Sequence, residues 1–136
     1  MHVRFQRQLS VALENQPGRL AAISRLLADR GIHIEAISVI DNVEQGMVRL
    51  MTSDPVASRA ALEDSGLHVV EAEVIAIETR DRLGKLALIT EALAEAGVNI
   101  DYAYASVDHA GAQTRLILKT SHPRQAGEVL TALRDR

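Results

Sequence analysis

The chain has 136 residues, of which 47% are hydrophobic and 24% charged, a composition typical of folded proteins that excludes a disordered chain. Its formal net charge of -3 argues against the basic surface of a nucleic-acid binder, and no apolar run approaches the roughly 20 residues that span a bilayer. The absence of cysteine excludes disulfides and thiolate chemistry. Because the N-terminus also lacks the apolar core of a signal peptide, we expect a cytoplasmic protein.

The chain begins with a predicted strand and helix. Apolar and polar side chains alternate over residues 9–13, which is the pattern of a half-buried strand. Pro17 suits the first position of a helix, because its missing N–H has no partner to lose there. Apolar residues of segment 20–27 recur at helical spacing, and Gly31 suits the left-handed position that ends a helix.

Two further strands and a second helix follow. Residues 32–40 are rich in β-branched side chains, a polar turn comes next, and residues 47–52 predict the returning strand. Asp54 and Pro55 are an N-cap and a first-turn proline, so a second helix is expected from there to Gly66. The first half of the chain therefore predicts the order β-α-β-β-α.

The second half predicts the same order of elements. Its expected strands and helices are a strand at 74–79, a helix at 83–96, strands at 98–107 and 114–120, and a helix at 123–134.

An internal repeat explains this similarity. With an offset of 66 residues, Gly18–Glu35 aligns with Gly84–Asp101, and 8 of these 18 positions are identical while five more are conservative changes. Two unrelated amphipathic helices would not agree to this extent. We therefore interpret the chain as a duplication, with one repeat at residues 1–67 and the other at residues 68–136.

The ends of the two repeats predict an exchange of strands. The second repeat has no residues left for a strand after its last helix, whereas the first can use residues 68–73. Two long antiparallel strands at about residues 3–14 and 68–79 would serve both repeats. The apolar phase of the second long strand shifts at Ile75, which predicts a bulge or a break in it.

Three segments of the first repeat resemble the ACT domain family: Leu9–Val11, Glu14–Leu20 and Arg30–Ile34. Segment 9–39 is similar to the opening of the small regulatory subunit of acetohydroxyacid synthase. The second repeat keeps the glycine and leucine of the motif in segment 81–86 but lacks its proline. The resemblance implies an α+β fold of two ferredoxin-like βαββαβ repeats with antiparallel sheets. It also implies dimers that bind amino acids at their interfaces as allosteric effectors.

The turn before each first helix is the candidate binding site. Unpaired amides of Gly18, Arg19 and Leu20 at a helix start can donate to a ligand carboxylate. Asn15 can accept from an α-ammonium group, and Asp81 in the second repeat would attract that group more strongly. The complete set of candidate ligand-binding residues is Asn15, Gln16, Pro17, Gly18, Arg19 and Leu20 in the first repeat, and Asp81, Leu83, Gly84 and Lys85 in the second.

A structural role is the alternative at these turns. Gly18 and Gly84 would then be needed only for helix-sheet packing, and Leu20 and Leu86 are expected in the core in either case.

Side chains from the following strands would wall the pockets. Ile37 and Val39 are expected to do so in the first repeat, and Ala103 and Ala105 in the second. We also hypothesise that Tyr102 and Tyr104, which stand where the first repeat has Ala36 and Ser38, narrow the second pocket.

Catalysis and metal binding have no support in the sequence. The five histidines lack the spacing and the acidic neighbours of a metal site, no serine lies in a nucleophile elbow, and no cofactor motif is present. We therefore predict a non-enzymatic amino-acid sensor, acting as a homodimer or on a partner such as a biosynthetic enzyme. Neither nucleic acid nor a membrane is an expected partner. The alternative is a structural protein that assembles through its sheets and binds no ligand.

Overall fold

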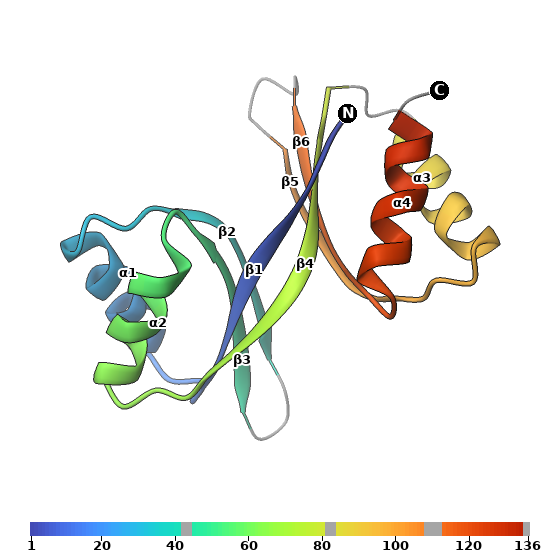
Figure 1. Ribbon diagram of the computed structural model, residues 1–136. Helices are drawn as coiled ribbons and strands as arrows, with labels where there is room; N and C mark the ends of the chain where they lie inside the picture. The colour runs from blue at the N-terminus through green and yellow to red at the C-terminus, as the bar shows by residue number, and fades with distance from the viewer. Residues whose placement is uncertain (42–44, 81–83, 108–112, 135–136) are drawn as a thin grey trace. The chain divides into compact units, whose positions relative to one another are not determined.

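The computed structural model describes residues 1–41, 45–80, 84–107 and 113–134 (Figure 1). Within these residues the chain forms six strands and four helices, which confirms the α+β class. In chain order they are β1 (His2–Leu13), α1 (Arg19–Asp29), β2 (Ile34–Asp41), β3 (Gly46–Thr52), α2 (Pro55–Asp64), β4 (Val69–Thr79), α3 (Lys85–Glu95), β5 (Ile100–Val107), β6 (Thr114–Thr120) and α4 (Pro123–Arg134).

The chain folds into two compact units whose boundaries fall inside β1 and β4. The first unit is Arg7–Ala72, and the second is Met1–Gln6 together with Glu73–Arg136. Each unit therefore takes part of both long strands, which confirms the expected sharing (Figure 1). The division of the sequence into repeats at 1–67 and 68–136 stays a prediction about the duplication.

The first unit has the strand order β2-β3-β1-β4, with α1 and α2 on one face of the sheet. Strand β3 pairs antiparallel with both neighbours, so that Leu9 of β1 lies opposite Leu50 and Ile37 of β2 lies opposite the same residue. Burying one leucine side chain completely stabilises the fold by about 1.5–3 kcal/mol. The core comprises Leu9, Val11, Leu13, Ile23, Leu27, Ile32, Val48, Leu50, Ala61, Leu62 and Val69.

The second unit repeats this design with the strand order β1-β4-β6-β5 and the helices α3 and α4. Strand β4 pairs antiparallel with β6, and Ile75 and Ile77 lie opposite Leu118 and Leu116. Its core comprises Ile75, Ile77, Ile89, Leu93, Val98, Leu116, Leu118, Ala126 and Leu130.

Strand β4 is continuous over Val69–Thr79, so the expected break in it is wrong. The apolar pattern of β4 shifts just after Ala72 and Glu73, where the strand passes from the first unit to the second. On one side Val69 packs in the first core, and on the other Ile75 packs in the second. The strand changes its buried pattern because it passes from one core to another.

The helices α2 and α4 each begin with a proline, but α2 carries a buried hydroxyl group in its first turn where α4 has none. In the first unit the Oγ1 of Thr52 and the Oγ of Ser58 lie 2.7 Å apart, and Ser58 also donates to the carbonyl of Asp54 at 2.7 Å. In the second unit Ala126 takes the place of Ser58. Thr120, which takes the place of Thr52, is 1% exposed, and its Oγ1 has no hydrogen-bond partner among the described residues.

Ala126→Ser is therefore expected to stabilise the second unit. The new hydroxyl would lie between Thr120 and the carbonyl of His122, and we expect the free energy of unfolding in urea to rise by about 1 kcal/mol. The matched change Ser58→Ala leaves Thr52 without its partner and should lower the free energy of unfolding by about 1–2 kcal/mol. A loss of stability in Ala126→Ser would contradict this account.

Candidate functional site

The connection from β1 to α1 depends on a left-handed glycine. Gly18 is the N-cap residue of α1 with φ +89°, and Gly84 is the N-cap residue of α3 with φ +77°. A Cβ added to either glycine would meet no atom within 4 Å. The glycines are thus required by the backbone conformation and not by close helix-sheet packing.

Of the first three backbone amides of α1, one donates a hydrogen bond within the chain. The N–H of Arg19 donates to the carbonyl of Gln16 at 3.3 Å, so this amide closes the turn instead of facing a ligand as the sequence predicted. The amides of Leu20 and Ala21 have no acceptor within the described part of the chain. These two carry the partial positive charge of the helix start and remain available to an anion.

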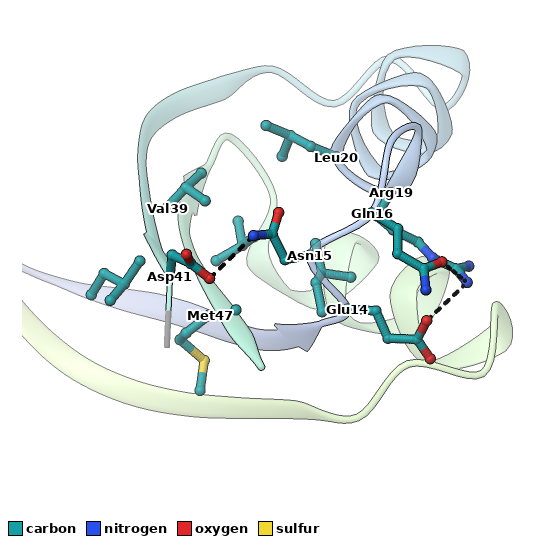
Figure 2. Close-up of a pocket in the computed structure, with 12 residues that line it drawn as sticks. Glu14, Asn15, Gln16, Arg19, Leu20, Val39, Asp41 and Met47 are labelled. Atoms are coloured by element: carbon teal, nitrogen blue, oxygen red, sulfur yellow. Dashed lines mark hydrogen bonds and ion pairs between the residues drawn. The ribbon is translucent and has the colours of Figure 1, made fainter. Parts of the chain in front are cut away.

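A pocket of about 180 Å³ lies beside this helix start (Figure 2). Four of the predicted residues, Asn15, Gln16, Arg19 and Leu20, are among those that line it, whereas Pro17 and Gly18 belong to the same loop without lining it. The lining residues are Leu13, Glu14, Asn15, Gln16, Arg19, Leu20, Val39, Ile40, Asp41, Gly46, Met47 and Val48.

Exposed apolar side chains form one wall of the pocket. Val39 and Ile40 at the end of β2 are 57% and 39% exposed, and Leu20 is 39% exposed. Val39 lies in the wall as predicted, but Ile37 is not among the lining residues. Apolar side chains that remain open to solvent around a hollow are typical of a binding surface.

The expected burial of Leu20 and Leu86 is wrong. Leu20 is 39% exposed, and Leu86, at the same place in α3, is 55% exposed. Both lie in the first turn of their helices, whereas the buried residues of α1 begin at Ile23 and those of α3 at Ile89. The exposed position makes Leu20 available to a ligand.

The polar lining residues separate into two groups (Figure 2). In one group, the Nδ2 of Asn15 donates to Oδ1 of Asp41 at 3.3 Å. In the other, the guanidinium group of Arg19 donates to the side-chain oxygens of Glu14 and Gln16, each at 3.3 Å. The pocket therefore presents the Asp41 carboxylate in one part, and in another the ion pair of Arg19 with Glu14 together with Leu20 at the helix start.

Sequence reasoning missed Asp41, which it placed at the start of a turn. Strand pairing brings this residue to the site, because Leu13 lies opposite Gly46 and Gly46 lies opposite Asp41. A Cβ on Gly46 would lie 3.3 Å from the carbonyl oxygen of Leu13, so the strands approach closely here. The β-branched side chains of residues 32–40 predicted a strand. They did not predict how this strand pairs with its neighbour, and that register is what brings Asp41 to the site.

The predicted site of the second repeat is described only in part. Gly84 begins α3 in the same left-handed conformation as Gly18, and Lys85 is the first residue of that helix. Asp81 and Leu83 lie outside the described residues.

The strand residues expected around that second site all lie on β5. Tyr102 and Tyr104 are half-buried, and Ala103 and Ala105 are exposed. Narrowing of a second pocket by the tyrosines stays a hypothesis.

Other kinds of site find little support in the described residues. No group of three histidine, aspartate or glutamate side chains there is arranged to hold a metal ion. No helix in the same residues has the length and apolarity needed to cross a bilayer. The pocket offers the Asp41 carboxylate, the positive end of α1 in a separate part and an apolar wall, which together suit a small zwitterion with an apolar side chain.

Comparisons with known structures agree with this fold. Protein BT0572 from Bacteroides thetaiotaomicron is 29% identical, with a TM-score of 0.89 over 97% of this chain and 90% of that one. The ligand-free regulatory subunit of aspartate kinase from Thermus thermophilus is 17% identical, with a TM-score of 0.70 over 97% of this chain and 96% of that one. The curated proteins compared with the sequence gave no match.

The family resemblance inferred from the turn motifs is confirmed by a family model. The model for the ACT domain pair matches residues 4–134, whereas the likeness to the acetohydroxyacid synthase subunit stays a resemblance. Because the match includes both repeats, the chain belongs to the ACT domain pair family.

Proposed function

We propose that this chain is a non-catalytic regulatory module that binds a small apolar amino acid at the start of α1 and signals its presence to a partner. The observation that carries the proposal is the pocket of about 180 Å³, whose lining includes Asp41 in one part and Arg19 and Leu20, the first two residues of α1, in another. The similar Thermus thermophilus chain is a regulatory subunit of aspartate kinase, which supports a biosynthetic enzyme as the partner.

The charges of the pocket assign an orientation to the ligand. The α-ammonium group would donate to the carboxylate of Asp41 and to the amide oxygen of Asn15, while the carboxylate would accept from the amides of Leu20 and Ala21. The guanidinium group of Arg19 would leave Glu14 and pair with the ligand carboxylate instead. This exchange costs little, because the side chains of Arg19 and Glu14 are both exposed and lie 3.3 Å apart.

The size and the apolar wall favour an aliphatic side chain. A volume of about 180 Å³ equals about six water molecules at roughly 30 Å³ each, which matches a small amino acid. Val39, Ile40 and Met47 carry no charge and would leave a charged side chain without a partner.

Strand β2 supports a homodimer as the signalling form. It is the outer strand of the first unit and pairs with β3 alone among the described strands. Its side chains Ile37, Val39 and Ile40 are 42%, 57% and 39% exposed. Open strand edges with apolar side chains associate with other strands, and a second chain here would cover the mouth of the pocket. The same edge favours the alternative of a scaffold without a ligand, so ligand binding must be measured directly.

Calorimetric titration with the standard amino acids tests ligand binding. We expect saturable heat with aliphatic amino acids and a 10- to 100-fold weaker affinity in Asp41→Asn, because the ammonium group loses its charged acceptor. The control Asp29→Asn removes an exposed carboxylate of α1 that does not line this pocket and should leave the affinity unchanged. No heat with any amino acid would support the scaffold instead.

Matched glycine substitutions test the position of the site. Gly18→Asp and Gly84→Asp both place a side chain at a left-handed position and should each lower the free energy of unfolding by about 1 kcal/mol. Only Gly18→Asp also places a negative charge at the N-cap of α1, next to the amides that would bind the ligand carboxylate, so it alone should weaken binding. Equal affinity in the two folded variants would remove the α1 turn from the site.

Sedimentation of a β2 variant tests the dimer. Val39→Lys places a charge in the proposed strand interface, and we expect the mass of the assembly to halve. Val56→Lys changes a valine on α2 that is 80% exposed and should leave the mass unchanged. An unchanged mass in Val39→Lys would place the interface elsewhere.

A further inference from the structure

The two units differ at one equivalent place, where the second helix of the first unit adjoins β4 and the second helix of the second unit adjoins β1. In the first unit, Arg59 of α2 forms ion pairs with Glu63 of the same helix and with Glu71 of β4. The pKa of Arg59 is raised, chiefly by the hydrogen bond with Glu63 and then by that with Glu71. Glu71 also pairs with Arg7 at 2.9 Å. Ion pairs thus occupy this surface of the first unit.

In the second unit, Gly127 and Phe5 take the places of Arg59 and Glu71. A Cβ on Gly127 would lie 2.5 Å from Cζ of Phe5, so the ring rests directly on the backbone of α4. The glycine is explained by this contact, since any side chain would displace the ring. Even so, Phe5 remains 47% exposed, and it is the only phenylalanine of the chain.

A hollow of about 580 Å³ adjoins the ring of Phe5. Its lining includes Val3, Gly127 and Ala132, which are apolar, and two charged residues of α4, Arg124 and Glu128. Arg124 and Glu128 are one helical turn apart, and neither forms an ion pair within the described residues.

Two of the other helices, α1 and α2, form ion pairs at this spacing. Arg25 pairs with Asp29 on α1 at 3.5 Å, and Arg59 pairs with Glu63 on α2. Arg124 and Glu128 have the same spacing but leave both charges to the solvent. Arg124 and Glu128 line the same hollow as the exposed ring of Phe5. This surface therefore suits a partner that places a negative charge opposite Arg124 and a positive charge opposite Glu128.

We propose that the α4 surface, defined as Phe5, Arg124, Gly127 and Glu128, binds the same surface of a second copy of the chain. Two antiparallel α4 helices related by a two-fold axis place Arg124 opposite the partner's Glu128, and Glu128 opposite the partner's Arg124. The charge order is self-complementary because reversing the helix exchanges the two positions. The exposed part of each Phe5 ring becomes covered in the same contact.

This contact is separate from the β2 dimer and does not depend on ligand binding. A chain with both two-fold contacts forms a closed assembly of four copies, whereas either contact alone gives a dimer. Charge-reversal variants can therefore address the α4 surface by itself.

Sedimentation velocity of charge-reversed chains tests the proposal. Arg124→Glu brings two pairs of carboxylates together and Glu128→Arg brings two pairs of guanidinium groups together, so each variant alone should lose half the assembly mass and dissociate more than tenfold more readily. An equimolar mixture of the two variants restores both attractive pairs and should recover the wild-type mass. The double variant R124E/E128R should recover it as well.

The controls separate this proposal from the β2 dimer. Arg25→Glu reverses another exposed arginine, on α1, and should not change the mass. In a Val39→Lys background, Arg124→Glu should still reduce the remaining dimer to monomer. An unchanged mass in Arg124→Glu, or a mixture that stays dissociated, would overturn the α4 contact and leave the β2 dimer and the ligand site unaffected.

Discussion

The antiparallel register of three strand ends in the first unit is the constraint on which the account depends. Leu13 of β1, Gly46 of β3 and Asp41 of β2 lie side by side, so the loop that follows β1 reaches the end of β2. The left-handed Gly18 then turns the chain into α1 and leaves its first amides beside that strand end. A carboxylate and a helix start thereby line one pocket, although they come from different segments of the sequence.

The two units share one design, as the duplication inferred from the sequence predicts, and they differ at a few equivalent positions. The helix starts at Gly18 and Gly84 retain the same conformation. Two polar side chains of the first unit are replaced in the second. Ala126 takes the place of Ser58, which contacts Thr52, and Gly127 takes the place of Arg59, which forms ion pairs. The first unit holds the described pocket at its helix start, whereas the second carries an exposed aromatic ring and an open charge pair. These differences among the described residues support the two proposals, a ligand site on the first unit and an association surface on the second.

Much of the fold could be predicted from the sequence because local patterns determine it. Alternation predicted β1, β-branched residues predicted β2, and α4 is found at residues 123–134 as expected. Pro17 was expected to open the first helix, but α1 begins at Arg19 because the left-handed Gly18 is its N-cap residue. The missing last strand predicted the sharing of β1 and β4. The residues near the pocket were harder. Asp41 and Met47 reach it through strand register, and Leu20 is exposed because the sheet covers α1 only from Ile23 onward; both effects are tertiary and leave no periodic signal.

The central claim is that a small amino acid binds at the start of α1, and an NMR titration tests it most directly. Amide spectra of the ¹⁵N-labelled protein would be recorded while an aliphatic amino acid is added. The account predicts saturable shifts of the Leu20 and Ala21 amides and of the Asn15 side-chain amide, with the α4 amides unchanged. Saturable shifts that leave these three groups unaffected, or no shifts with any aliphatic amino acid, would contradict it.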